Sequence, residues 1–245
     1  PQARCRGVGG DRQAQLIMQG EQAGVIVEGV VGFDLDRAFG MAQSGQPRRA
    51  SQSRRPIEQR HPEAGIARIM LNRPETANAQ DTRFLYELNA AFDRAAHDDD
   101  IRVIILAANG KHFSSGHDLA EKNWYEAMHE HDTVGTMCGF TCAGAERQMA
   151  REEEIYLGFS ERWRNIPKPT IAAVQGKCIA GGLMLVWPCD LIIAADDASF
   201  TDPTVSFGVG GVEYFHHLWE VGARKAKEML FTSDALSAQD AHRLG

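Results

Sequence analysis

The chain has 245 residues, of which 43% are hydrophobic and 24% are charged, and its formal net charge is −7. This composition is ordinary for a globular protein with one main core, and the negative charge argues against a nucleic-acid surface. No apolar run is long enough for a membrane span and no secretory signal opens the chain, so we expect a cytoplasmic protein without a membrane partner. The five cysteines form no CxxC pair and no zinc-like spacing with histidine, which predicts free, mostly buried thiols and no metal.

Residues 1–62 differ in composition from the rest of the chain. They contain nine arginines, no lysine and six acidic residues, with clusters such as QPRRASQSRRP. We expect a disordered or non-native extension, which a misplaced translation start in a GC-rich gene would produce; an Arg-rich tail that binds nucleic acid is the alternative. The sequence therefore predicts one folded domain at 63–245.

Strand and helix patterns alternate regularly after this extension. Short apolar runs predict strands at 66–71, 102–107, 170–174 and 190–194. Apolar residues at helical spacing predict helices at 82–97, 147–165 and 221–232. Asp81 is the expected N-cap of the first helix, and Ser237 with Asp240 predicts a capping box for a last one. Segment 121–144 has no clean period, so we predict a mobile segment with partial helix.

The stretch from Pro169 to Asp190, PTIAAVQGKCIAGGLMLVWPCD, is the one around which we expect the rest to be organised. A buried strand turns through Gly176 into Gly181-Gly182, which opens a short apolar helix. Pro188 ends that helix after roughly two turns. Glycines at the first turn leave N–H groups bare at the positive end of the helix, where an oxyanion could bind. Close packing of the loop against the helix is the alternative reason for them.

A second turn has the same character. Gly110 to Leu119, GKHFSSGHDL, follows an apolar strand and places Gly116 at a turn. Together these stretches resemble the crotonase (enoyl-CoA hydratase/isomerase) family, from about Ile66 to Gly245. The ordered matches are IARIMLNRPETANA, RVIILAANGKHFSSGHDL, KPTIAAVQGKCIAGG with CDLIIAA, and VGARKAKEMLFTSDALSAQDAHRLG.

The resemblance implies an α/β fold built as a crotonase-like spiral of ββα units. It also implies an acyl-CoA substrate, with coenzyme A as part of the substrate and no separate cofactor, and assembly as a homo-trimer or hexamer. Two family features have no evident counterpart in the sequence: a strand before Ile66 and further C-terminal helices. We therefore expect a C-terminally truncated domain whose oligomer is weakened.

The resemblance assigns the two oxyanion-hole donors to the backbone N–H groups of His117 and Gly181. Such a hole binds the thioester oxygen, which gains negative charge as an enolate forms. The family positions that hold the nucleotide and pantetheine of CoA correspond to Ala77, Ala79, Phe113 and Ser115. The His117 imidazole is expected to be a bystander or part of the pocket wall. Asp118 lies among the substrate-binding positions, but we expect it to order its own turn by an Asx-type bond.

The sequence departs from the family at the two glutamates that hold and split water in the hydratases. Met184 and Thr204 occupy those positions, and neither side chain is a general acid or base near neutral pH. We therefore expect these two residues to contact the substrate without taking part in proton transfer. Glu213, just after the glycine-rich run 208–211, is the expected acid–base residue; an exposed structural glutamate is the alternative. Asp202 could substitute for it, or could only cap its own turn.

The remaining histidines favour structural roles. His216 and His217 suit packing at a helix start better than catalysis, and His129 with His131 suits a surface segment better than a metal site. The sequence therefore predicts a crotonase-type enzyme, of lyase or isomerase type, that stabilises the enolate of an acyl-CoA thioester. A non-catalytic acyl-CoA-binding protein is the alternative.

Overall fold

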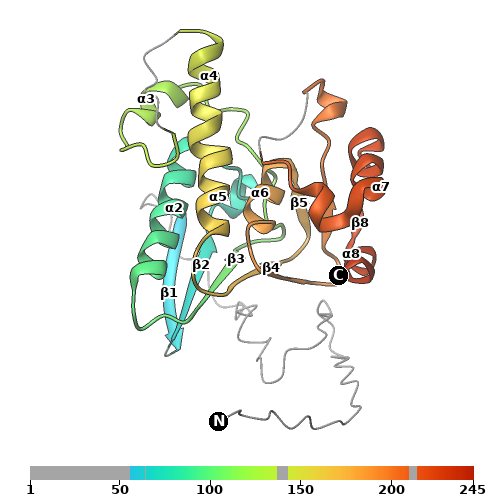
Figure 1. Cartoon of the computed structure of the whole chain (residues 1–245), viewed down its shortest axis with the longest axis horizontal. Helices are drawn as coiled ribbons and strands as arrows, with labels where there is room; N and C mark the ends of the chain where they lie inside the picture. The colour runs from blue at the N-terminus through green and yellow to red at the C-terminus, as the bar shows by residue number, and fades with distance from the viewer. Residues whose placement is uncertain (1–55, 64, 137–142, 210–213) are drawn as a thin grey trace, which may run out of the picture.

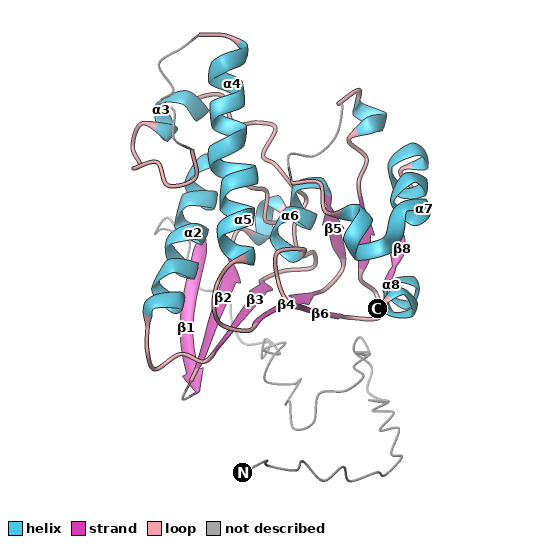
Figure 2. Ribbon diagram, viewed as in Figure 1, coloured by secondary structure: helices cyan, strands magenta, loops and turns pink. Residues whose placement is uncertain are grey.

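The computed structural model describes residues 56–63, 65–136, 143–209 and 214–245, with the backbone alone at 58–63. The larger of its two sheets has five strands in the order β1-β2-β3-β4-β6 (Figure 1 and Figure 2). These strands are β1 (Ile57–Glu63), β2 (Ile66–Leu71), β3 (Val103–Ala108), β4 (Thr170–Val174) and β6 (Leu191–Ala194). β1 pairs with β2 in antiparallel fashion, and the other neighbours are parallel. The four parallel strands lie within one residue of the predicted apolar runs.

β1 corrects the expectation that no strand precedes Ile66. It begins at Ile57, inside the stretch that the sequence assigns to the extension, and its pairing with β2 shifts register between Arg60 and Glu63. Its sequence, IEQRHPE, has no apolar alternation. Charged residues and proline are typical of edge strands, where one row of backbone groups needs no partner, so an apolar pattern could not reveal this strand.

A smaller sheet and a set of helices complete the described chain. The smaller sheet has the order β5-β7-β8, with strands β5 (Lys177–Ile179), β7 (Ser199–Thr201) and β8 (Leu236–Ser237). The α-helices are α2 (Thr82–His97), α3 (Trp124–Met128), α4 (Ala145–Glu152), α5 (Phe159–Arg164), α6 (Leu183–Val186), α7 (His217–Thr232) and α8 (Ala238–Leu244). The other helical turns are η1 (Pro74–Thr76), the π-helical η2 (Glu153–Gly158), η3 (Ala180–Gly182) and η4 (Val205–Phe207).

The predicted caps are present at the helix starts. Asp81 accepts a hydrogen bond from the N–H of Phe84 at 2.8 Å, and Ser237 accepts one from the N–H of Asp240 at 3.1 Å. Helix α7 begins before the predicted residue 221, and Gly222, with a φ of 75°, interrupts its helical backbone. That interruption explains why a single helical period does not extend across the start of α7.

The core lies on both faces of the larger sheet because alternate strand residues point to opposite sides. Ile69 and Leu106 belong to the larger apolar cluster, which also contains Phe84 of α2. Ile105 and Ile171 belong to a smaller cluster on the opposite face. Burial of both faces accounts for the nearly continuous apolar sequence of β2, β3 and β4. In β6, by contrast, Leu191 and Ile192 are exposed.

The long helix predicted at 147–165 contains a π-helical segment that the sequence pattern did not predict. Glu154 in this segment is 0% exposed. Its carboxylate accepts hydrogen bonds from the backbone N–H groups of residues 134–136, at 2.6 to 2.8 Å, and from the hydroxyl of Tyr86 at 3.1 Å. Glu154 therefore ties segment 134–136 and helix α2 to the helix that carries Tyr156 toward the candidate site.

The described residues also bear on the expected absence of membrane spans and metal sites and on the state of the cysteines. Within the described ranges, no helix is long and apolar enough to cross a membrane, and no cluster of metal-ligating side chains is found. Cys178 and Cys189 are free and buried, and burial raises the pKa of both thiols. Cys5, Cys138 and Cys142 lie outside the described residues.

Glu154→Gln should lower the free energy of unfolding by about 2 to 4 kcal/mol, because buried donors would lose their charged acceptor. Urea unfolding followed by circular dichroism measures the loss. Glu152→Gln, on the same helix, is the matched control and should change the free energy by less than about 0.5 kcal/mol. Equal effects of the two substitutions would show that the buried carboxylate does not hold these elements together.

Candidate active site

Three turns from separate parts of the chain meet at one edge of the larger sheet. They follow β2, β3 and β4, which are parallel, so their carboxyl ends lie side by side. Isolated β-bridges join Gln80 to His117 and Ser114 to Cys178. Ligands of open α/β sheets bind beyond the carboxyl ends of the strands, which makes this edge the candidate site.

The side chain of Ser114 links the first two turns. It is 0% exposed, and its hydroxyl donates to the carbonyl of Asn78 at 2.9 Å. The same oxygen accepts from the side-chain amide of Gln80 at 3.0 Å and from the N–H of Gly116 at 3.2 Å. The backbone of Ser114 is in turn bonded to β5, through Lys177 at 3.2 Å and Ile179 at 3.0 Å. One buried residue therefore joins the first two turns to β5.

Asn78 holds the turn after β2 in an unusual conformation. Ala77 and Asn78 both have left-handed backbones, with φ values of 51° and 54°. The Asn78 side-chain amide donates to the carbonyls of Asn109, His112 and Phe113, at 3.0 to 3.1 Å. Left-handed residues other than glycine are disfavoured, so these bonds offset the cost of the turn.

The backbone N–H groups of His117 and Gly181 have no hydrogen-bond partner among the described residues. Gly181 lies in the first turn of η3, where an N–H has no acceptor within the helix. The turns are in contact: a Cβ on Gly116, whose φ is 89°, would lie 2.8 Å from the carbonyl of Ile179 and 3.1 Å from the nitrogen of Gly181. The two unpaired donors are therefore held close together.

The His117 imidazole packs on the turn that contains Gly181. A Cβ on Gly181 would lie 2.5 Å from its Cδ2 and Nε2 atoms, so any larger residue there would displace the ring. The ring stacks on Tyr156 with 3.9 Å between centroids, and its buried Nε2 has no hydrogen-bond partner among the described residues. The imidazole thus forms a wall of the site, which is one of the two roles expected for it.

The charge state of His117 follows from its surroundings. Burial and the nearby positive charge of Arg151 lower its pKa to about 4, while the carboxylate of Asp202 acts in the opposite direction. The ring is therefore neutral near pH 7. The two backbone N–H groups consequently have no imidazolium charge beside them that would attract the same anion.

The structure places the predicted CoA-contact residues on the turns after β2 and β3, which Ser114 links and which are called the linked turns below. Ala77 is half-buried and Ala79 is buried. Ser115 is exposed, and its N–H donates to the carbonyl of Ala77 at 2.9 Å. Phe113 is 0% exposed and packs in the larger apolar cluster, so its side chain supports the turn from beneath.

Asp118 makes the Asx-type bond expected of it. One carboxylate oxygen accepts from the N–H of Ala120 at 3.0 Å. The other accepts from the guanidinium of Arg73 at 3.1 Å, and Arg73 also lies 2.8 Å from Asp81. These partners give Asp118 a structural role in joining the first two turns.

Met184 and Thr204 occupy different environments. Met184, on α6, is 2% exposed within the larger apolar cluster. Thr204 is half-buried, and its N–H and hydroxyl donate to Asp202 at 3.1 and 2.7 Å, so Asp202 caps its own turn. The structure also pairs Asp202 with His217 at 2.8 Å, and both side chains are 0% exposed. No motif spacing joins Asp202 to His217, so only the fold could reveal this pair.

Glu213, the predicted acid–base residue, lies outside the described residues. His216 is the N-cap residue of α7 and His217 is its first residue, in agreement with the predicted packing at a helix start.

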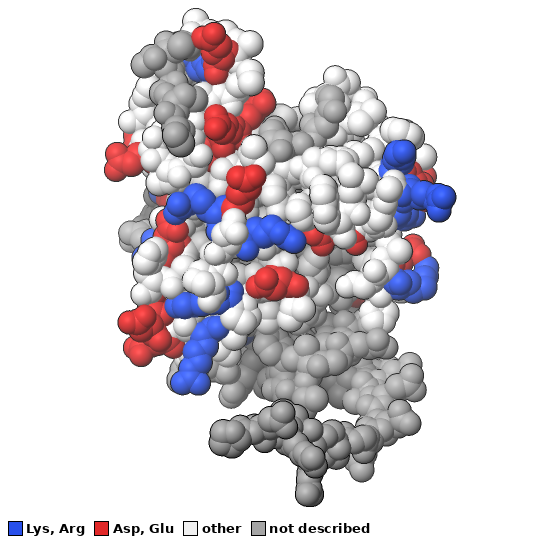
Figure 3. All heavy atoms as spheres, in the orientation of Figure 1, with Lys and Arg blue, Asp and Glu red and all other residues white. Residues whose placement is uncertain are grey.

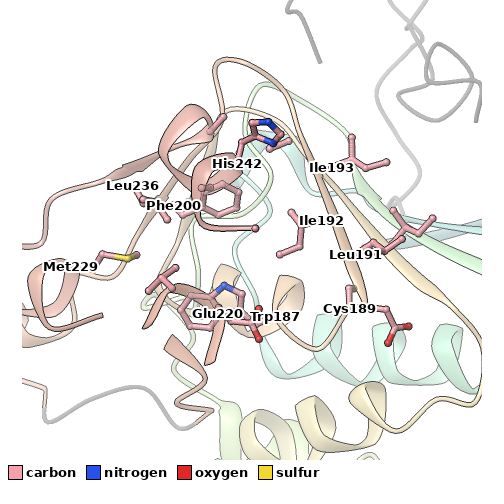
Figure 4. Close-up of a pocket in the computed structure, with 17 residues that line it drawn as sticks. Trp187, Cys189, Leu191, Ile192, Ile193, Phe200, Glu220, Met229, Leu236 and His242 are labelled. Carbon is pink, nitrogen blue, oxygen red and sulfur yellow. The ribbon is translucent and has the colours of Figure 1, made fainter. Parts of the chain in front are cut away.

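A cavity of about 360 Å³ lies beside β6, α7 and α8, away from the linked turns (Figure 4). Its labelled lining side chains are Trp187, Cys189, Leu191, Ile192, Ile193, Phe200, Glu220, Met229, Leu236 and His242. None of the predicted site residues contributes to it. The turns that carry His117 and Gly181 and this mainly apolar cavity are therefore separate features.

The imidazole of His117, which is half-buried with its Nε2 fully buried, should make stability depend on pH. Its folded-state pKa of about 4 lies below the ordinary value of 6.5, so the unfolded chain takes up the proton first as pH falls. This group should leave the free energy of unfolding unchanged above pH ~6.5 and lower it between about pH 6.5 and 4, by up to about 3 kcal/mol. His117→Phe keeps an aromatic ring on Tyr156 and should remove that decline in urea titrations. The same decline in the variant would assign it to other groups.

The comparisons with known proteins agree with this geometry. A family model described as enoyl-CoA hydratase/isomerase matches residues 61–245. The enoyl-CoA hydratase homologue EchA13 of Mycobacterium tuberculosis is 44% identical over 185 residues, which cover 74% of this chain and 58% of the relative. The rat mitochondrial enoyl-CoA hydratase domain-containing protein 3 is 35% identical, over 74% of this chain and 55% of the relative. The chain thus spans little more than half the length of these curated relatives.

Solved structures show the same fold. A crystal structure from Mycobacterium smegmatis, described as an enoyl-CoA hydratase, is 51% identical with a TM-score of 0.67, over 78% of this chain and 69% of the other. An enoyl-CoA hydratase/isomerase from Xanthobacter autotrophicus is 35% identical with a TM-score of 0.64, over 78% and 64%. The mainly parallel sheet and these similarities lead to one conclusion: the chain belongs to the enoyl-CoA hydratase/isomerase family, the crotonases.

Proposed function

We propose that the protein binds an acyl-CoA thioester and stabilises its enolate between the backbone N–H groups of His117 and Gly181. The observation that carries this proposal is the pair of unpaired donors on turns that buried hydrogen bonds hold together. Donors fixed in advance stabilise developing charge without rearrangement, and one such donor is worth about 2.7 to 4 kcal/mol in the transition state.

The surroundings of the donors support an anionic intermediate. When the α-proton leaves, the electrons of the broken C–H bond move toward the thioester oxygen, which becomes negative. The guanidinium of Arg151 lies 5.2 Å from the centre of the Tyr156 ring, which stacks on His117. Its positive charge is shared with Glu121 at 3.5 Å, and it lowers the pKa of His117 and favours a nearby anion. The neutral His117 ring keeps water away from one side of the donors, which strengthens their interaction with charge.

The CoA part of the substrate is proposed to follow the linked turns. Ala77 and Ala79 have no long side chain that would keep a ligand from the backbone, and Ser115 is exposed beside them. The names of the relatives, as enoyl-CoA hydratases, support a CoA ester as the ligand. On the face shown in Figure 3, basic and acidic side chains of the described residues are interspersed, which fits a small anionic ligand better than nucleic acid.

A proton shift between acyl carbons is proposed in preference to addition of water. Met184 is buried in the core cluster and the hydroxyl of Thr204 is engaged with Asp202, so neither can take the part of a water-splitting glutamate. Glu213 remains the proposed acid–base residue, because it follows a glycine-rich run that lets the backbone approach a ligand. Isomerisation then needs only one carboxylate and the two amide donors.

A non-catalytic acyl-CoA-binding protein is the second candidate. It is favoured by the absence of titratable side chains at Met184 and Thr204. A cytosolic location and a homo-trimeric or hexameric assembly also stay predictions.

The wild type should exchange the α-protons of bound butyryl-CoA with deuterated solvent, and Glu213→Gln should abolish that exchange because an amide cannot accept the proton. Affinity for butyryl-CoA should be nearly unchanged. Mass spectrometry of the recovered ester measures exchange, and titration calorimetry measures affinity. Glu228→Gln, at an exposed position on α7, is the matched control and should exchange at the parent rate.

The outcomes separate the candidates. Binding by the wild type without exchange would identify the non-catalytic binder and contradict the proposed enzyme. Exchange by Glu213→Gln at the parent rate would show that Glu213 is structural while leaving the enolate chemistry in place.

A further inference from the structure

Arg151, on α4, is a nearly buried cation with few partners. Its side chain is 13% exposed. Among the described residues it makes one hydrogen bond, a long one of 3.5 Å to the carboxylate of Glu121, and its buried Nε has no partner. A guanidinium carries five N–H donors, and burying a charged group whose donors are unused is costly. Glu121 alone therefore does not use the hydrogen-bonding capacity of this side chain.

Glu121 is committed mainly to the start of α2. Its carboxylate accepts from the N–H of Thr82 at 3.1 and 3.2 Å and from the hydroxyl of Thr82 at 3.1 Å. The side chain of Glu121 is 9% exposed, so these bonds fix it in place. Its single contact with Arg151 orients the guanidinium and leaves the other N–H groups available.

Aromatic rings hold the guanidinium without using its donors. The Cζ atom of Arg151 lies 5.0 Å from the centre of the Trp124 ring and 5.2 Å from that of Tyr156. Trp124 belongs to α3, which lies beside α4 at one end of the molecule (Figure 1). Ring faces attract a cation by their quadrupole, whereas N–H groups in the guanidinium plane bind a carboxylate through paired hydrogen bonds. The surroundings thus suit a guanidinium that binds a carboxylate.

Ring contacts connect this guanidinium to the proposed oxyanion donors. Tyr156 stacks on His117 with 3.9 Å between centroids, and the edge of the His117 ring lies 2.5 Å from the Cβ position of Gly181. The charge of Arg151 also contributes to the lowered pKa of His117, in agreement with these contacts. Because CoA is proposed to follow the linked turns, the acyl chain is the part of the ligand that extends past Tyr156.

We propose that Arg151 is a specificity-determining residue that binds a carboxylate at the far end of the acyl chain, so that the preferred ligands are CoA esters of short dicarboxylic acids. The inference rests on the proposed function, because it assumes that a CoA ester occupies the site. A distal carboxylate pairs with the unused donors of Arg151, whereas an uncharged chain end leaves them unpaired. Dicarboxylic esters therefore bind more tightly than uncharged esters of equal length.

The test compares glutaryl-CoA with its monoamide, in which a neutral amide of nearly the same shape replaces the distal carboxylate. The succinyl and adipyl pairs vary the length of the chain. Titration calorimetry should show that the wild type binds the acid of at least one pair about tenfold more tightly than the amide, or better, because the hydrogen bonds of the acid are charge-assisted.

Substitutions of Arg151 separate carboxylate binding from a structural role. Arg151→Gln should bring the acid-to-amide ratio of affinities close to one. Arg151→Lys keeps the charge without the planar fork and should retain part of the preference. A purely structural role would weaken acid and amide alike and leave the ratio at its wild-type value, which would overturn the proposal.

Arg147, one turn earlier on α4, offers a matched control. Its guanidinium lies 3.8 Å from the centre of the Tyr125 ring, so Arg147→Gln removes the same charge from a similar contact. This variant should keep the wild-type ratio. An equal fall of the ratio in Arg147→Gln and Arg151→Gln would assign the preference to the general charge of α4 and contradict a carboxylate bound at Arg151.

The affinities of the wild type separate the two proposals without any variant. If acid and amide bind equally well at all three lengths, the inference fails while the proposed acyl-CoA function stands. If the wild type binds none of these esters and no butyryl-CoA, the proposed function fails and the inference falls with it.

Discussion

The buried hydroxyl of Ser114 is the contact on which the candidate site depends. It donates to the turn after β2 and accepts from Gln80 and from the N–H of Gly116, while its backbone bonds to β5. A buried hydroxyl that fills its hydrogen-bonding capacity in this way makes each neighbouring turn costly to move separately. The amides of His117 and Gly181 therefore keep their relative position without being bonded to each other.

Local strain is concentrated in the same turns. Ala77, Asn78 and Ala180 have left-handed backbones, which cost about 1 to 2 kcal/mol each for residues other than glycine. The side-chain amide of Asn78 binds three carbonyls of the neighbouring turn, which stabilises two of these residues. Ala180 lies directly before Gly181, so its conformation sets the direction in which the η3 turn presents its unpaired N–H. Strained residues held by surrounding bonds are typical of binding and catalytic turns.

The sequence predicted most of the elements that carry the site and few of the contacts between side chains. Strands β2, β3 and β4 were predictable because both faces of the sheet are buried there, so their apolar runs are nearly continuous. β1 was not, because its edge position permits the charged sequence IEQRHPE. The predicted donors at His117 and Gly181 came from the family resemblance, because glycines at a turn can equally serve close packing of a loop against a helix. The pairing of Asp202 with His217, and the choice of Glu154 as a buried acceptor, depend on tertiary contacts that no periodicity encodes.

The central claim, that fixed backbone donors polarise a thioester, is tested most directly by the infrared frequency of the carbonyl in bound, carbon-13-labelled butyryl-CoA. Two hydrogen bonds should lower that frequency below its value in water. Gly116→Ala would place a Cβ 2.8 Å from a carbonyl and move the turn, whereas Gly222→Ala has the same kind of φ with no atom within 4 Å. The account predicts a lowered frequency in the wild type and in Gly222→Ala, and a return toward the solution value in Gly116→Ala. A bound wild-type carbonyl that absorbs at its solution frequency would contradict it.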